Sequence, residues 1–263
     1  MFIDKSSDRI YLKSRLLNDV THGFTTKCGG FSHGKIDGLN LGFRCGDDAE
    51  SVKKNYKAVS EDLQMPYDAI VTARQTHSAN IRIVTKEDMG KGVIRDSDIA
   101  DTDGLITNCT DIPLVVFYAD CVPVLLFDSR QRVVAAVHSG WRGTATGIVK
   151  NAVEIMNDRF GSAPHNIKAA IGPSIGPCCF EVGREVAECF DKDLVRPLKN
   201  EKYTVDLWNA NRRMLMQSGV PAENIDVFEM CTVCNCDKLY SYRSHGEKTG
   251  RMGAFIMLRG EEC

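Results

Sequence analysis

The fold is decided by two apolar stretches near the middle of the chain, PLVVFYADCVPVLLFD (residues 113–128) and RVVAAVHSG (residues 132–140). Both are rich in β-branched residues and bounded by turn-forming residues, which is typical of strands buried on both faces. A shorter run, DGLIT (residues 103–107), has the same character. The centre of the chain is therefore predicted to be a buried sheet whose strands end at polar residues.

Helical and strand-like patterns alternate on either side of this centre. Apolar residues recur at helical spacing over residues 49–64, and further helices are expected at about 142–159, 181–190 and 208–219, the last ending at Gly219. Further strands are expected in the first ~20 residues, on both sides of a polar turn in 69–84, and in 167–176, 224–230 and 254–260. The glycine-rich segment 21–42 is expected to be a long structured loop. The pattern predicts a mixed α/β (α+β) fold with a mixed sheet, forming a single catalytic domain over residues 1–263.

Composition excludes several classes of function. The formal net charge of −2 gives no electrostatic reason for binding nucleic acid or an anionic membrane. The longest apolar runs contain an Asp and two Pro and are too short to span a bilayer. Eleven cysteines are an odd number in a long chain, and the first residues have no apolar run of signal-peptide length, so we expect a cytoplasmic protein with reduced thiols.

Three candidate metal ligands lie where apolar runs meet turns: His77 in RQTHSAN, Cys121 in YADCVPVLLF and His138 in VVAAVHSG. Two imidazoles and one thiolate suit zinc, and three protein ligands with an open fourth position are the arrangement of a catalytic site. Asp120 is a candidate partner that orients an imidazole or tunes the metal. Spacing alone leaves an alternative open, in which Cys121 is a buried apolar residue and both histidines are ordinary hydrogen-bonded groups.

A series of motifs resembles one family from end to end. The motifs are TTKCGGFSHGKIDGLNLGFRCGDD (25–48), RQTH (74–77), DTDGLIT (101–107), ADCVPVLLFD (119–128), AAVHSGWRGT (135–144), IGPSIGPCCFEVG (171–183), VDLWNAN (205–211) and SYRSHGEKTGRM (241–252). In this order they resemble the polyphenol oxidase or purine nucleoside phosphorylase family, which also has a laccase-domain label. ADCVPVLL followed by HSGWRGT is very specific to that family.

The resemblance implies both a fold and an activity. The implied fold is a layered α/β sandwich related to toxin-type cysteine hydrolases. The implied activity is phosphorolysis of adenosine, inosine and S-methyl-5′-thioadenosine at a zinc site on His77, Cys121 and His138. Together with our interpretation of Asp120, this makes Cys121, His138 and Asp120 the expected catalytic residues. Adenosine deamination and a copper-linked phenol oxidation are also implied. The expected partners are a purine nucleoside and phosphate, and the oligomeric state is left open.

Phosphorolysis requires groups that hold phosphate and ribose. Arginine suits phosphate because its planar guanidinium donates hydrogen bonds in pairs, and Arg44, Arg74 and Arg142 lie in or beside the motifs. Asn40 and Asp103 lie in glycine-containing turns and could contact ribose or base, with structural turn roles as the alternative.

The sequence leaves three rival functions open. Copper could occupy the same three ligands and support phenol oxidation, although the chain lacks the H-x-H pairs of a multicopper oxidase. A metal-free cysteine hydrolase could use Cys121 as nucleophile and His138 as base on an amide such as a peptidoglycan precursor. A non-catalytic nucleoside-binding protein is the third.

Two further groups of cysteines are not assigned to the metal site. CTVCNC (231–236) contains a C-x2-C-x-C pattern but lacks the other half of a standard metal motif, so Cys234 and Cys236 are interpreted as adventitious thiols. Cys178 and Cys179 follow a tight turn and could be redox-active, but packing is the preferred interpretation.

Overall fold

The two central stretches form three strands in the computed structural model, which describes residues 2–6 and 8–260. They are β7 (Leu114–Tyr118), β8 (Val122–Asp128) and β9 (Val133–Ser139). Nearly all of their side chains are buried, which confirms the prediction from sequence. The first stretch is not one continuous strand, however, because β7 and β8 belong to different sheets and residues 119–121 connect them.

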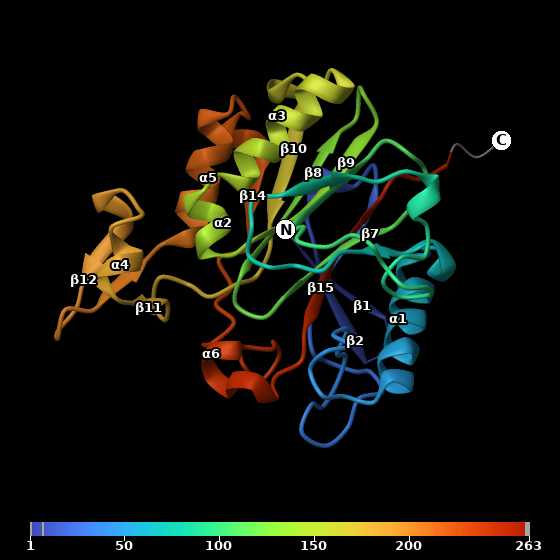
Figure 1. Ribbon diagram of the computed structural model, residues 1–263, viewed down its shortest axis with the longest axis horizontal. Coiled ribbons are helices and arrows are strands. Elements are labelled where there is room, and N and C mark those ends of the chain that lie inside the picture. Colours follow the sequence, from blue (N-terminus) through green and yellow to red (C-terminus); the bar gives the residue numbers. More distant parts are fainter. Residues whose placement is uncertain (1, 7, 261–263) are drawn as a thin grey trace.

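Two six-stranded sheets form the centre of the molecule (Figure 1). The first contains β1 (Phe2–Ser6), β2 (Arg9–Lys13), β3 (Thr21–Thr25), β15 (Met252–Met257), β7 and β4 (Val71–Thr72), in that order. The second contains β14 (Ile225–Val227), β10 (Ile167–Ile171), β8, β9, β6 (Gly104–Thr107) and β5 (Ile81–Ile83). The pairs β4–β7, β10–β14 and β5–β6 are parallel and the others antiparallel, so the predicted mixed sheet is confirmed.

The sheets and helices form a layered α/β sandwich, as expected. On β8, Leu125 and Phe127 point into a core shared with the first sheet, whereas Val124 and Leu126 point to the opposite face. This alternation is the period-two pattern of a strand buried on both sides. Helices α3 (Ile148–Phe160) and α5 (Leu207–Gln217) cover the outer face of the second sheet.

The outer face of the first sheet is covered by α1 (Ala49–Leu63), whose Tyr56 and Val59 pack in one buried cluster with Val115 and Phe255 of the sheet. Figure 1 shows α1 on the opposite side of the strands from α3 and α5. A small sheet of β11 (Glu181–Val182), β13 (Tyr203–Val205) and β12 (Val195–Pro197) projects beside α4 (Arg184–Ala187).

Several predictions of local structure are confirmed and four need correction. The helix predicted at 181–190 covers only Arg184–Ala187 (α4), because Glu181–Val182 pair in the small sheet as β11. The helices at α1 and α5 are as predicted, with Gly219 just beyond the end of α5 in the left-handed region at φ 92°. The helix predicted at about 142–159 is two helices, α2 (Trp141–Ala145) and α3. They are separated at Gly147, whose φ of 86° is readily adopted only by glycine.

The other two corrections concern strands. Residues 21–25 form β3 in the middle of the first sheet, so only the remainder of the glycine-rich segment is a loop, and His22 is buried in a strand. The strands predicted within 69–84 do not pair around their turn, because β4 lies in the first sheet and β5 in the second. Among the described residues, no helix is both long enough and apolar enough to cross a membrane.

Candidate active site

Strand register and two crossings between the sheets bring the predicted metal ligands together. In the antiparallel pair β8–β9, Pro123 lies opposite His138, so Cys121 at the entrance of β8 reaches the end of β9. Cys121 itself lies on the crossing from β7 to β8. His77 lies on the crossing from β4 to β5, so two segments that connect the sheets meet the end of β9.

The geometry of these residues fits one metal ion. The candidate ligand atoms of His77, Cys121 and His138 all lie within 4.8 Å of one another, and the two imidazole centroids are 5.1 Å apart with ring planes at 71°. Zinc bonds of about 2.0 to 2.3 Å in a tetrahedron place ligand atoms roughly 3.3 to 3.8 Å apart, which small side-chain adjustments reach from here. Gly140 leaves the necessary room, since a Cβ there would lie 2.9 Å from His77 and 3.2 Å from Cys121.

The buried carboxylate of Asp103 organises this centre. Its Oδ1 lies 2.7 Å from Nδ1 of His138. The two carboxylate oxygens also accept hydrogen bonds from the backbone N–H groups of Thr76, His77 and Ser78. Burial opposes ionisation, but the hydrogen bond and charge of His138 outweigh it and hold the pKa of Asp103 well below its usual range. Asp103 is not among the residues that line the pocket described below, so these contacts support its structural alternative.

Asp120 makes hydrogen bonds to groups other than the two imidazoles. Its carboxylate accepts hydrogen bonds from the Thr232 hydroxyl and from the backbone N–H of Arg243, both at 2.6 Å. It orients neither imidazole, and the partner of His138 is Asp103 instead. Asp120 lines the pocket beside Cys121 and ties the β7–β8 crossing to the C-terminal part of the chain.

The local field favours a thiolate at Cys121. Burial would raise the pKa of this thiol, but His138 and His77 overcome that effect and lower it to about 6. Burial would likewise lower the pKa of His138, yet Cys121 and Asp103 raise it to about 9. A thiolate is the form that binds metal and the form that acts as a nucleophile, so both chemistries are supported.

The backbone at the site is held in unusual conformations. His77 has φ 64° and Asp120 has φ 97°, both in the left-handed region that non-glycine residues rarely adopt. The hydrogen bond from the N–H of His77 to Asp103 and that from Ile175 to the carbonyl of Asp120 restrain these two positions. Such restrained outliers cluster at functional sites, because surrounding structure must maintain them.

A cleft of about 1030 Å³ opens over the three candidate ligands, a size that accommodates a nucleoside and a phosphate. Arg44 and Arg74 line it, and within the part of the chain that the structure describes their guanidinium groups have no hydrogen-bond partner. Arg142 does not line the cleft and instead lies over the ring of Trp141, 4.2 Å from its centroid. Trp141 both lines the cleft and packs against the core.

Asn40 stands outside the cleft and organises the loop that carries Arg44. Its side chain donates to the Gly42 carbonyl and to Asp47, and it accepts from the backbone N–H groups of Gly42 and Arg251. Because Asn40 is fully buried, these contacts support the structural alternative for this residue.

The sequence reasoning missed the contribution of the C-terminal segment to the cleft. Tyr242 and Arg243 in α6 (Tyr242–His245), together with Arg251, line the same cleft as Arg44 and Arg74. Arg243 donates to the carbonyl of Cys179 and Arg251 to those of Thr249 and Gly250. The motif SYRSHGEKTGRM contained these residues, but nothing in it indicated a position beside Cys121.

Comparison with known proteins identifies relatives that match nearly the whole chain. The chain is 39% identical over 248 residues to a protein from Geobacillus stearothermophilus named purine nucleoside phosphorylase YlmD, covering 91% of this chain and 90% of that one. It is 36% identical over 234 residues to adenosine deaminase RL5 from an unknown prokaryotic organism, covering 84% and 89%. The crystal structure of the hypothetical protein YfiH from Bacillus licheniformis superposes with a TM-score of 0.92 at 35% identity, covering 98% and 99%. The model of the family described as multi-copper polyphenol oxidoreductase laccase matches residues 21–259, and the chain therefore belongs to that family.

Proposed function

We propose that the protein is a zinc-dependent purine nucleoside phosphorylase acting on adenosine, inosine and S-methyl-5′-thioadenosine, with adenosine deamination as a side activity. The observation that carries the proposal is a cleft in which Arg44 and Arg74, whose guanidinium groups have no partner among the described residues, share a space with His77, Cys121 and His138. The names of the relatives from Geobacillus stearothermophilus and from the unknown prokaryote support a purine nucleoside as substrate and adenosine deamination as a side activity. The choice of inosine and S-methyl-5′-thioadenosine rests on the family resemblance.

In phosphorolysis the bond between ribose C1′ and the purine nitrogen breaks, its electron pair leaves with the base, and a phosphate oxygen bonds to C1′. Arg44 and Arg74 would hold the phosphate, because a guanidinium pairs with two of its oxygens at once. The aromatic side chains of Phe43, Trp141 and Tyr242 along the cleft offer apolar surface for the base. Asp120 fixes the wall beside Cys121 through Thr232 and Arg243.

The three ligands define what a bound metal would add. When bound by His77, Cys121 and His138, zinc supplies a Lewis acid that stabilises negative charge developing on the substrate. Asp103 fixes the orientation of the His138 ring, so its other nitrogen remains directed at the centre. The same ligands also accept copper, but the combination of two imidazoles, one thiolate and an open position is the usual catalytic site of zinc.

A cysteine hydrolase is the second candidate, and one observation favours it. Asp103 contacts His138, and His138 lies beside the low-pKa thiol of Cys121, which is the order of a carboxylate–imidazole–thiol catalytic triad. In this reaction Cys121 would attack an amide carbonyl while His138 transfers its proton to the leaving amine.

The decisive experiment measures zinc content and phosphate-dependent release of purine base for the native protein and Cys121→Ala. The proposal predicts that the variant loses one zinc per chain together with base release, whereas Cys189→Ser, at an exposed cysteine far from the cleft, retains both. Copper in place of zinc, with base release intact, would overturn the choice of metal. Activity that resists chelators but is lost to thiol reagents would establish the hydrolase instead.

A further inference from the structure

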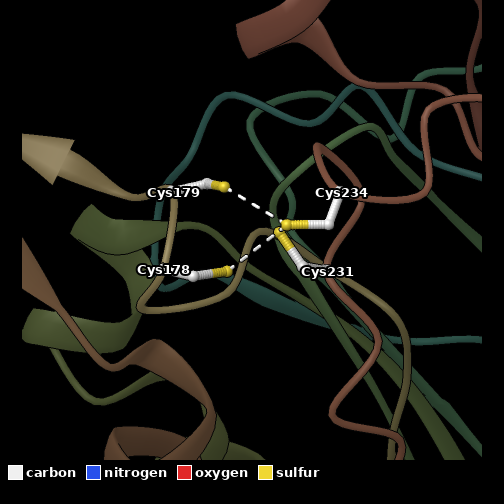
Figure 2. Close-up of side chains that lie close together, drawn as sticks. All are labelled: Cys178, Cys179, Cys231 and Cys234. Atoms are coloured by element: carbon white, nitrogen blue, oxygen red, sulfur yellow. Dashed lines mark hydrogen bonds between the residues drawn. The ribbon is translucent and has the colours of Figure 1, made fainter.

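A second group of potential metal ligands lies outside the site described above. The Sγ atoms of Cys178, Cys179, Cys231 and Cys234 all lie within 4.8 Å of one another. Figure 2 shows the sulfur atoms of Cys178 and Cys179 pointing from one loop toward those of Cys231 and Cys234 on another. The expectations that Cys178 and Cys179 serve packing and that Cys234 is an adventitious thiol do not account for this convergence. Cys236 is not a member of the group.

Sheet topology explains why residues more than fifty positions apart meet here. Strands β10 and β14 are parallel neighbours, so the loops that follow them leave the same edge of the sheet. The pairing continues beyond the strands, since Ser174 bridges to Cys231 and the N–H of Thr232 donates to the carbonyl of Ser174 at 3.1 Å. The loop after β10 carries Cys178 and Cys179, and the loop after β14 carries the other two.

The sulfur distances distinguish between a disulfide and a metal site. Sγ of Cys234 lies 3.6 Å from that of Cys178 and 3.5 Å from that of Cys179. A disulfide requires about 2.0 Å. Four thiolates around zinc at about 2.3 Å stand roughly 3.8 Å apart in a tetrahedron, which is close to the observed separations.

Three features of the cluster favour metal binding. Cys231 and Cys234 form a C-x2-C pair, the spacing found in structural zinc sites. The backbone N–H of Gly176 donates to Sγ of Cys231 at 3.3 Å, a contact that stabilises negative charge on sulfur. Cys231 is buried, whereas Cys178 and Cys234 are exposed, so an ion has access from solvent.

We propose that these four cysteines bind a structural zinc ion, distinct from any metal held by His77, Cys121 and His138. Four thiolates in a closed tetrahedral set hold zinc without an open position, and the thiol protons pass to solvent as the ion binds. The ion cross-links the loops after β10 and β14 and thereby fixes one wall of the cleft.

Hydrogen bonds connect the loops that carry the four cysteines to residues that line the cleft. Arg243 donates to the carbonyl of Cys179 at 3.1 Å, and Thr232, between the cysteines of the C-x2-C pair, donates to Asp120. Ile175 and Phe180, which flank the other two cysteines, line the cleft. Loss of the ion is therefore expected to loosen Asp120 and Arg243 without removing any ligand of the first centre.

The test compares zinc content of the purified native protein with that of Cys234→Ser and Cys179→Ser, using Cys236→Ser as the matched control two residues along the same loop. Each cluster variant should lose one zinc per chain relative to the native protein, and the control should lose none. The double variant Cys121→Ala/Cys234→Ser should lose one zinc more than Cys121→Ala alone, which separates this site from the first. Equal zinc in native protein and cluster variants would overturn the proposal.

A second measurement tests the proposal even if the cysteine variants fail to fold. Cobalt(II) added to the metal-free Cys121→Ala protein, in which the cluster is intact, should give the intense thiolate-to-cobalt absorption of tetrahedral sulfur coordination. Absence of that absorption, a Cys179–Cys234 disulfide in protein purified under reducing conditions, or iron in place of zinc would each refute the zinc assignment.

Discussion

Asp103 holds His138 by two contacts at once. Its Oδ1 lies 2.7 Å from the imidazole Nδ1, and its backbone carbonyl accepts the N–H of His138, also at 2.7 Å. The same carboxylate accepts the backbone N–H of His77. One buried side chain thus positions two of the three candidate metal ligands, although it does not itself line the cleft.

We expect Asp103→Asn to weaken metal binding at the first centre by roughly 10- to 100-fold, because an amide orients an imidazole less firmly than a carboxylate does. Competition with a zinc chelator measures the change. Asp101→Asn is the matched control, since Asp101 contacts Thr76 and Asn80 of the same loop but not His138. Unchanged affinity in Asp103→Asn would show that the ring is held by other means.

Gly140→Ala should block the first centre while leaving the fold intact. The new Cβ would lie 2.9 Å from His77 Cδ2 and 3.2 Å from Cys121 Sγ, so both side chains must move out of ligand geometry. We expect loss of one zinc per chain and of base release, with an unchanged circular dichroism spectrum. Gly23→Ala serves as the control, since its Cβ would meet Leu63 at an ordinary 3.4 Å. Full zinc content in Gly140→Ala would count against the assigned ligands.

Substitution of Arg44 or Arg74 by Ala should raise the KM for phosphate more than that for the nucleoside. The loss of one charged hydrogen-bond donor to phosphate costs about 1.5 to 3 kcal/mol, which corresponds to roughly 10- to 100-fold in KM. Arg142→Ala should leave the KM for phosphate unchanged, because Arg142 does not line the cleft. Steady-state kinetics at varied phosphate measure these KM values. A larger effect of Arg142→Ala than of Arg44→Ala or Arg74→Ala on the KM for phosphate would contradict the proposed phosphate site.

The buried His22 should make the protein less stable in mild acid. Its Nε2 accepts the backbone N–H of Ser14 at 2.9 Å, and burial lowers its pKa to about 4. Between this value and the unfolded value of about 6.5, the unfolded chain binds more protons than the folded one, so stability falls as pH decreases through that window. The contribution lost between pH 7 and pH 5 is about 2 kcal/mol.

Urea unfolding at pH 7 and pH 5 tests this expectation. His22→Gln cannot become charged, so its free energy of unfolding should fall by about 2 kcal/mol less than that of the native protein over the same interval. His165→Gln, at an exposed histidine, should behave as the native protein does. An equal decrease in the free energy of unfolding of the native protein and of His22→Gln would show that other groups cause the acid sensitivity.

The amino-acid sequence by itself determined the buried strands, the mixed sheet, the helices α1 and α5 and the three candidate metal ligands. Period-two burial on β8 and β9 and the helical spacing of Tyr56 and Val59 are local patterns, so they can be recognised without knowing what packs against them. His77, Cys121 and His138 could be selected because each is a chemically distinctive residue at the polar end of an apolar run.

Only the tertiary structure decided which polar groups meet. The choice of Asp103 over Asp120 as the partner of His138 depends on the pairing of β6 with β9, and the Cys178–Cys179–Cys231–Cys234 cluster depends on the parallel pairing of β10 with β14. The four-cysteine cluster has no complete sequence motif, because its second half is a pair of adjacent cysteines far away in the chain. Strand order and register are long-range properties set by how whole faces pack, so a local pattern that identifies each strand does not identify its neighbours.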